Sequence, residues 1–195
     1  MWSKTENRGA AMNKGNPLVK EAMKMKPITV QPSTSVKEAA TLMAKHGIGN
    51  CIVVDGKPVG IITESDIVKK VVAQDLQASK IPVGNIMSTP LLVIDPYVSL
   101  EEAMKTMGKC NIRRLPVVEQ GELIGIITQK DISRISPILH EISREWVSIS
   151  GTDESYWRKQ VFSGKCEDCG SLSTHLKNID GRLLCEDCID ALKFE

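Results

Sequence analysis

An internal repeat constrains this chain more than any other feature of its sequence. The segment from Val19 matches the segment from Val83 at an offset of 64 residues, and the match continues until a one-residue insertion in the second copy. Beyond that insertion, Gly-Ile-Ile-Thr-x-x-Asp-Ile at 60–67 matches the same sequence at 125–132. Such self-similarity predicts two copies of one unit, each too small to bury its own sheet, that pack together about a pseudo-twofold axis.

Each copy predicts the element order β-α-β-β-α, which places the chain in the α/β class. The first helix of each copy opens with a Ser-x-x-Glu capping box, at 35–38 and at 99–102, in which hydroxyl and carboxylate satisfy free backbone N–H groups. Apolar residues then recur at helical spacing, so one face of each helix is buried. Gly47 and Asn111 lie at matching points, and both residue types tolerate the left-handed conformation that ends a helix.

The second half of each copy predicts a hairpin and a closing helix. In the first copy, the apolar runs 52–54 and 59–62 flank an Asp-Gly turn, which is typical of a β-hairpin. A helix is then expected from Asp66 to about Gln74.

The second copy carries the fuller strand sequence Ile112-Arg-Arg-Leu-Pro-Val-Val118. With the duplicated Gly-Ile-Ile-Thr-x-x-Asp-Ile motif, it resembles the cystathionine β-synthase (CBS) domain, and the doubled copy resembles the CBS pair called a Bateman module. The resemblance covers residues 17–137, with one repeat at 17–80 and the other at 81–137. It implies a regulatory module that binds adenosine-containing ligands (AMP, ADP, ATP or S-adenosylmethionine) in clefts between the copies and forms a homodimer through its helices.

Two Thr-x-x-Asp pairs, Thr63 with Asp66 and Thr128 with Asp131, are the candidate ligand-binding groups at helix starts. A carboxylate supplies an acceptor for the two hydroxyl groups of a ribose, and free N–H groups at a helix start attract phosphate. The same pattern is also a capping box, which stability alone would explain. The resemblance favours the functional interpretation, because it implies that this Asp binds ribose and this Thr lies near the phosphates.

The two clefts are predicted to be unequal, because Arg113 and Arg114 stand where the first copy has glycine and asparagine. The resemblance implies that these arginines and Lys130 face the ligand held by Asp66. Guanidinium groups suit phosphate oxygens, so this cleft is expected to prefer a phosphorylated adenosine. A solvated strand edge is the alternative interpretation of the arginine pair.

The opposite cleft, built on Asp131, is expected to take an uncharged or cationic adenosyl group or to stay empty. Its facing residues are predicted to be Gly49, Asn50 and Ser65. The adenine base is expected near first-strand residues that core packing explains equally well: Ile28, Thr29, Leu92 and Val93.

Six cysteines divide into two kinds by their spacing. Cys51 and Cys110 stand alone in apolar surroundings and are expected to be buried. The other four form C-x2-C, fifteen residues, then C-x2-C, which is typical of a zinc site in a chain without an export signal: Cys166, Cys169, Cys185 and Cys188. Four thiolates leave no open position on zinc, so the site would be structural rather than hydrolytic. The same geometry suits a single iron, which keeps a rubredoxin-like electron carrier as an alternative.

Residues 163–195 resemble a zinc ribbon, with a hairpin tip at Asp180-Gly181 and an apolar tail that closes as a helical turn. The whole chain has a net charge of only +1, and this segment holds four Lys or Arg residues against seven Asp or Glu residues. Four thiolates on a divalent metal add about two more negative charges. Phosphate backbones would be repelled, so a protein partner is favoured over nucleic acid, and a DNA-binding transcription regulator is the weaker alternative.

The remaining segments predict a tail and a connection. Residues 1–16 are expected to form a disordered basic tail, and residues 138–162 a helix and linker. Tyr156, Trp157 and Phe162 are expected to pack as core beneath the ribbon. No stretch is long and apolar enough for a membrane helix, and the N-terminus lacks the apolar centre of a secretory signal, so a cytoplasmic protein is expected.

The sequence contains no phosphate-binding P-loop and no nucleophile elbow. We therefore expect a non-enzymatic sensor, in which an adenosyl ligand bound to the CBS pair changes how the metal-bound ribbon meets a protein partner.

Overall fold

A computed structural model describes residues 17–135, 154–157 and 159–192 of the chain. The predicted α/β class and the β-α-β-β-α order of the first repeat are confirmed. Its sheet has the strand order β2-β3-β4, with β2 parallel to β3 and β3 antiparallel to β4. The elements are β2 (Thr29–Val30), α2 (Val36–His46), β3 (Asn50–Asp55), β4 (Lys57–Thr63), α3 (Glu64–Lys70) and the 3-10 turn η1 (Val72–Gln74).

The second repeat has the same order but a different set of strand partners. Its elements are β5 (Leu91–Leu92), α4 (Leu100–Lys109), β6 (Arg114–Glu119), β7 (Glu122–Thr128) and α5 (Gln129–Ile135). The sheet runs β1-β7-β6, and the parallel pairing seen between β2 and β3 is reduced here to a bridge between Ile94 and Val117. Strand β5 is thereby left available for another partner.

Each repeat receives part of its core from the segment that precedes the other repeat. Helix α1 (Val19–Ala22) and strand β1 (Lys24–Met25) pack on the second repeat, where Val19 is fully buried and donates its N–H to Val98 O at 2.8 Å. The equivalent turn η2 (Val83–Asn85) packs on the first repeat, where the Val83 N–H donates to Thr34 O at 2.8 Å. The exchange is reciprocal, so the two repeats are interlocked.

The predicted capping box is complete in one repeat and half-formed in the other. Ser35 Oγ accepts the Glu38 N–H at 3.2 Å, and Glu38 accepts the Ser35 N–H at 3.0 Å. Ser99 Oγ likewise accepts the Glu102 N–H at 3.2 Å. The prediction of the reciprocal bond, from the Ser99 N–H to the Glu102 carboxylate, is wrong, because that carboxylate accepts the Tyr156 hydroxyl at 2.6 Å instead.

Helix ends and hairpins lie close to their predicted positions. Gly47 (φ 61°) and Asn111 (φ 51°) both adopt the left-handed conformation after α2 and α4. The helix predicted to begin at Asp66 begins at Glu64 instead, because Thr63 is its N-cap and Asp66 is the third residue of its first turn.

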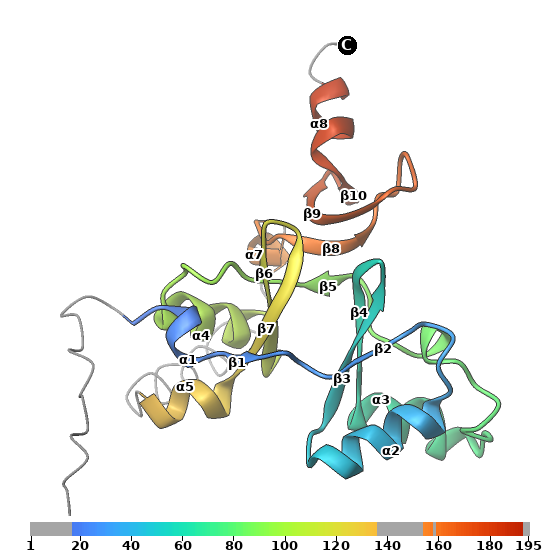
Figure 1. Cartoon of the computed structure of the whole chain (residues 1–195). Coiled ribbons are helices and arrows are strands. Elements are labelled where there is room, and N and C mark those ends of the chain that lie inside the picture. The colour runs from blue at the N-terminus through green and yellow to red at the C-terminus, as the bar shows by residue number, and fades with distance from the viewer. Residues whose placement is uncertain (1–16, 136–153, 158, 193–195) are drawn as a thin grey trace, which may run out of the picture.

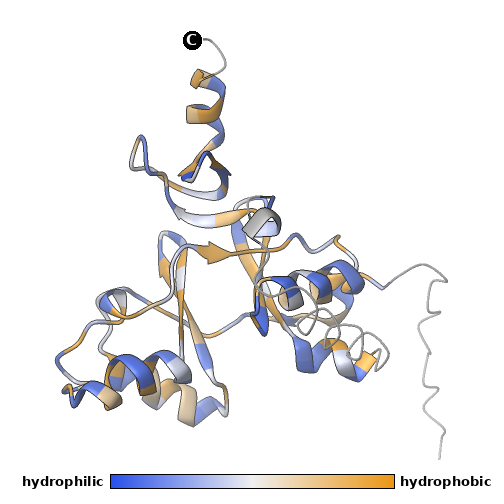
Figure 2. Ribbon diagram, turned by 180° about the vertical axis from the view of Figure 1, so that it is seen from behind, coloured by the Kyte–Doolittle hydropathy of each residue, from blue (hydrophilic) through white to orange (hydrophobic). Residues whose placement is uncertain are grey.

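The C-terminal segment forms a small ribbon-like unit of three strands and a helix, as predicted: β8 (Phe162–Lys165), β9 (Leu172–Ile179), β10 (Arg182–Leu184) and α8 (Glu186–Leu192). Asp180 (φ 49°) and Gly181 (φ 91°) form the predicted hairpin tip. Strand β8 pairs antiparallel with β5, so one sheet, β10-β9-β8-β5, runs from the ribbon into the second repeat (Figure 1). Figure 2 shows that β5 is hydrophobic along its length, as a buried joint requires.

Side-chain contacts fix the ribbon to both repeats. The Ser163 hydroxyl of β8 donates to Pro58 O in the first repeat. The short helix α7 (Glu154–Trp157) lies against the second repeat, where Tyr156 is 9% exposed and its hydroxyl contacts Thr106 Oγ1 at 3.1 Å. Trp157 stacks on Phe162 with ring centroids 5.8 Å apart and planes at 10°. The aromatic cluster predicted beneath the ribbon therefore forms, and it joins the ribbon to the core of the second repeat.

The predicted basic tail at 1–16 and residues 138–153 of the predicted helix and linker lie outside the described residues. Within the described ranges, no helix is long and apolar enough to cross a membrane.

Candidate functional site

A cavity of about 610 Å³ lies where the two repeats meet. Its walls come from the junction of β4 with α3 in the first repeat, from the segment through β5, and from the start of β6 in the second repeat. Helix α7 of the C-terminal segment contributes a further wall. The polar residues that line the cavity are Thr63, Glu64, Ser65, Asp66, Lys69, Lys70, Ser88, Arg113 and Arg114.

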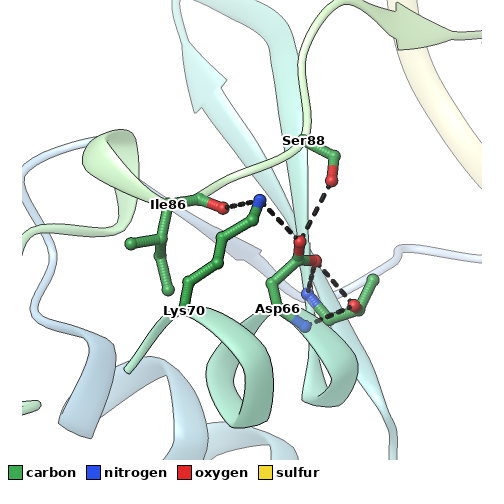
Figure 3. Close-up of polar contacts among 5 residues, drawn as sticks. Asp66, Lys70, Ile86 and Ser88 are labelled. Atoms are coloured by element: carbon green, nitrogen blue, oxygen red, sulfur yellow. Dashed lines mark hydrogen bonds and ion pairs between the residues drawn. The ribbon is translucent and has the colours of Figure 1, made fainter. Parts of the chain in front are cut away.

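The two carboxylate oxygens of Asp66 have different partners. Oδ2 accepts the Thr63 N–H at 3.0 Å and the Thr63 hydroxyl at 2.6 Å, which completes the capping box of α3. Oδ1 accepts the Lys70 ammonium at 2.8 Å and the Ser88 hydroxyl at 3.1 Å (Figure 3). Both of these partners line the cavity. Capping therefore uses one oxygen and leaves the other directed at groups of the cavity wall.

The charge on Asp66 is maintained by its neighbours. Burial opposes ionisation, but the Lys70 ammonium and the Thr63 hydrogen bonds outweigh it and hold the pKa of the carboxyl below its ordinary value. Lys70 is itself fixed, because its Nζ also donates to Ile86 O at 2.7 Å (Figure 3). The carboxylate is thus an ionised acceptor at neutral pH.

Arginines from the second repeat reach across to the first repeat. Arg114 Nη1 donates to Gly49 O at 2.9 Å. Burial and the neighbouring Arg113 lower the pKa of the Arg114 guanidinium, which still keeps its charge at neutral pH. Cations outnumber carboxylates among the lining residues, with Lys69, Lys70, Arg113 and Arg114 against Glu64 and Asp66.

The structure brings together some predicted ligand residues and separates others. Thr63, Asp66, Arg113 and Arg114 line the cavity, as does Leu92 from the predicted base region. Three predicted residues lie elsewhere in the described structure: Lys130 is exposed on α5, Thr29 lines a separate cavity of about 420 Å³, and Val93 is buried in a core cluster. Ile28 packs against the core of the first repeat.

Residues predicted for the opposite cleft do not gather around Asp131. Gly49 and Ser65 line the Asp66 cavity instead, because the β3 and α3 ends of the first repeat belong to its wall. Asn50 begins β3 and pairs with Thr63 across the hairpin.

Asp131 repeats the cap of Asp66 but has another partner. Its Oδ2 accepts the Thr128 N–H at 3.1 Å and the Thr128 hydroxyl at 2.5 Å. Its Oδ1 pairs with Lys24 Nζ at 3.2 Å. By the offset of 64 residues, Lys24 is the counterpart of Ser88, so a lysine stands where the other side has a hydroxyl. Each Asp Oδ1 therefore faces one lysine, and Asp66 Oδ1 has a hydroxyl partner as well.

The four C-terminal cysteines form a cluster whose ligand atoms all lie within 4.8 Å of one another. The Sγ atoms of Cys166 and Cys188 are 3.8 Å apart, as are those of Cys169 and Cys185. A tetrahedron with Zn–S bonds of about 2.3 Å has edges of about 3.8 Å, so these spacings fit a metal and are too long for disulfides. His175 is exposed on β9 and lies outside this cluster of possible ligands.

Backbone groups support this cluster as a metal site. The Cys185 N–H donates to Cys166 Sγ at 3.4 Å. Burial raises the pKa of the Cys166 thiol, but backbone hydrogen bonds from Cys185 and Cys169 outweigh it and lower the pKa to about 6, while contacts with the other thiols raise the pKa of Cys188. Gly170 takes φ +75° directly after Cys169, a left-handed conformation that glycine adopts without strain in the tight turn after the first C-x2-C pair. The residues present therefore fit a structural zinc ion.

Sequence reasoning missed several groups of the cavity, among them Lys70, Ser88 and Trp157. Lys70 had a local signal, because it lies four residues after Asp66 on one helix face. Ser88 and Trp157 had none, since both reach the cavity through contacts between distant segments. Trp157 lies outside the repeats, and its sequence context indicated only core packing.

Comparisons with known proteins agree with this architecture. The CBS domain model matches residues 19–73 and 83–137. An uncharacterized protein of Methanopyrus kandleri is 34% identical over 177 residues, covering 88% of this chain and 90% of the relative. A solved structure of a conserved protein from Pyrococcus horikoshii is 34% identical with a TM-score of 0.58, covering 62% of this chain and 92% of that one.

A second solved structure is the CBS domain pair of protein MJ0100 in complex with 5′-methylthioadenosine and S-adenosyl-L-methionine. It is 35% identical with a TM-score of 0.57, and the match covers 62% of this chain and 96% of that one. The two segments matched by the CBS model make up more than half of the present chain. The chain therefore belongs to the family of CBS-domain proteins, whose tandem pairs are regulatory, sensing modules.

Proposed function

We propose that this protein is a non-enzymatic sensor that binds an adenine nucleotide in the Asp66 cavity and signals through its metal-bound ribbon to a protein partner. One observation carries the proposal. Asp66 caps α3 with Oδ2 and presents Oδ1 to Lys70 and Ser88, which are groups that a ribose could replace. The complex of the MJ0100 pair with two adenosyl compounds supports this class of ligand.

The chemistry of the cavity favours AMP, ADP or ATP over S-adenosylmethionine. Ribose hydroxyls would take over Asp66 Oδ1, which would release Lys70 toward the phosphates. Arg113 and Arg114 lie in the same cavity, and guanidinium groups match phosphate oxygens in charge and geometry. The sulfonium of S-adenosylmethionine would be repelled by this excess of cations. For the Asp131 side we keep the proposal of an uncharged or cationic adenosyl group, or of no ligand, because Arg113 and Arg114 line the Asp66 cavity.

The pairing of β5 with β8 connects the ligand cavity to the ribbon. Leu91 and Leu92 of β5 line the cavity and pair with Ser163 and Phe162 of β8. A ligand that fixes β5 therefore fixes the edge of the ribbon sheet. The ribbon surface is expected to bind a protein, because the acidic residues inside the two C-x2-C turns would repel nucleic acid.

Zinc is the metal proposed for the four cysteines. It would hold the two C-x2-C turns together and make folding of the ribbon depend on metal. Iron in the same tetrahedron would give a rubredoxin-like electron carrier. A visible absorption band that bleaches reversibly on reduction would identify that alternative.

A homodimer through the helices is also proposed. Val68 of α3 and Val72 of η1 are apolar yet 57% and 65% exposed in the single chain. Burying such side chains against a second copy would stabilise a dimer by the hydrophobic effect.

A thermal-shift panel on the zinc-loaded protein tests the ligand class, using AMP, ADP, ATP and S-adenosylmethionine. A ligand at about 100 times its dissociation constant stabilises the folded state by roughly 2.7 kcal/mol. At about 2 to 4 °C per kcal/mol, the nucleotides should raise the melting temperature by several degrees. No shift with any of the three nucleotides contradicts the proposal, and a shift with S-adenosylmethionine alone contradicts the charge argument.

A further inference from the structure

A tryptophan from outside the two repeats forms part of the Asp66 cavity. Trp157 is the last residue of α7, in the segment that leads into the ribbon. Its side chain lines the cavity in company with Leu92, Ile112 and Pro116, all of which are apolar. Among the described residues that line this cavity, Trp157 is the aromatic one. The cavity thus has a charged region around Asp66 and the arginines and an apolar region that includes an indole.

The indole is held in place by one ring contact and by the anchoring of the residue before it. Phe162 stacks on it with ring planes at 10°, and Phe162 is the strand partner of the cavity residue Leu92. The preceding residue, Tyr156, is anchored on α4 by its hydroxyl, which donates to Glu102 Oε1 at 2.6 Å. Both contacts restrict the ring before any ligand arrives. An aromatic group that is already ordered loses little conformational freedom when a ligand binds to it.

A nucleotide has three parts, and the cavity has matching chemistry for each. If Asp66 takes the ribose and the arginines take the phosphate, as proposed above, the base is left to the apolar region. A purine is flat and has a π-face, which stacks favourably on an aromatic side chain. We infer that Trp157 contacts the base of the bound nucleotide by stacking, so that the segment leading into the ribbon completes the ligand site. This inference rests on the proposed function and adds to it a residue that the CBS repeats do not contain.

The inference gives nucleotide binding a direct mechanical link to the ribbon. A base stacked on Trp157 holds the indole against Phe162, which is the first residue of β8. The nucleotide therefore stabilises the docked ribbon, and by thermodynamic reciprocity a docked ribbon strengthens nucleotide binding.

Two ligands and two variants separate a base contact from a general structural role. Trp157→Leu keeps an apolar side chain but removes the π-face, whereas Trp157→Phe keeps an aromatic ring. We expect Trp157→Leu to weaken AMP binding by about tenfold or more and Trp157→Phe by clearly less. Ribose 5-phosphate lacks the base, so Trp157→Leu should leave its affinity unchanged in isothermal titration calorimetry.

A spectroscopic measurement covers the case in which Trp157→Leu fails to fold. With Trp2 and Trp146 replaced by phenylalanine, Trp157 is the one tryptophan left in the full chain, and its emission is excited apart from that of the two tyrosines. AMP should change its emission, and ribose 5-phosphate should not. Unchanged emission at saturating AMP overturns the inference.

The outcomes distinguish the inference from the proposed function. If AMP binds, Asp66→Asn weakens it and Trp157→Leu does not, the nucleotide site stands and the Trp157 contact is wrong. Equal loss of AMP and ribose 5-phosphate affinity in Trp157→Leu also overturns the base contact, because it indicates a structural effect. If the unmodified protein binds no AMP, both the proposed function and the inference fail.

Discussion

Replacing Tyr156 with phenylalanine tests how the ribbon is attached to the second repeat. The hydroxyl of Tyr156 donates to Glu102 Oε1 at 2.6 Å and lies 3.1 Å from Thr106 Oγ1, while the residue is only 9% exposed. The substitution removes this oxygen and keeps the ring that packs on α4. It therefore isolates the hydrogen bonds from the hydrophobic contact.

The magnitude follows from the partner's charge and exposure. A hydrogen bond to a charged group contributes about 1.5 to 3 kcal/mol. The Glu102 side chain is 47% exposed and lies 3.7 Å from Lys105 Nζ, so water and this lysine can replace part of the lost bond. The lower end, about 1.5 kcal/mol, is expected. At about 2 to 4 °C per kcal/mol for a chain of this length, the melting temperature should fall by roughly 3 to 6 °C.

The chain supplies a matched control, because its second tyrosine, Tyr97, is 57% exposed. Tyr97→Phe removes the same atom at the surface, where its hydroxyl bonds the Glu119 carboxylate, and should change the melting temperature by less than about 2 °C, since surface substitutions rarely exceed about 0.5 kcal/mol. Differential scanning calorimetry of the zinc-loaded protein compares the two variants. Equal melting temperatures for Tyr156→Phe and Tyr97→Phe would refute the anchoring role of Tyr156.

Three further predictions concern pH, metal and charge. Burial and the hydrogen bond to Glu102 raise the pKa of Tyr156 to about 12, from an ordinary value of about 10. The free energy of unfolding that this shift contributes is therefore present below about pH 10 and is lost as pH rises toward 12. Chemical denaturation across this pH range measures the loss. The protein should bind one zinc per chain, and Cys169→Ser should lower the metal content measured by mass spectrometry. The same variant should weaken AMP binding, because loss of the folded ribbon would release Trp157 from the cavity. Arg114→Gln should weaken AMP binding about tenfold and flatten its salt dependence, measured by calorimetry at two salt concentrations; an unchanged salt slope would exclude a phosphate contact.

Local sequence predicted the elements whose determinants lie within a few residues. The capping box at Ser35 and Glu38, the left-handed ends at Gly47 and Asn111, and the hairpin tips all depend on short-range hydrogen bonds or backbone conformations. The resemblance to the CBS domain, rather than any local pattern, implied that Arg113 and Arg114 would face Asp66, and all three residues line one cavity. These parts of the fold and site were predictable.

Contacts between distant segments were not predictable from the same patterns. The Glu102 carboxylate satisfies the local rule for a capping box, yet Tyr156, 54 residues away, takes it. Strand β5 is a two-residue apolar run whose partner is a ribbon strand, and nothing in its composition distinguishes that partner from β6. Trp157, which follows Tyr156 and stacks on the β8 residue Phe162, lines the cavity from outside the repeats.

The affinity of AMP for Asp66→Asn, compared with Asp131→Asn, tests the central claim most directly. Asparagine keeps an oxygen for the helix cap and removes the charge, and the two positions are equivalent in the repeat. Isothermal titration calorimetry should show AMP affinity at least about tenfold weaker in Asp66→Asn and close to that of the unmodified protein in Asp131→Asn. Equal losses in the two variants, or no loss in Asp66→Asn, would contradict an adenine-nucleotide site built on Asp66.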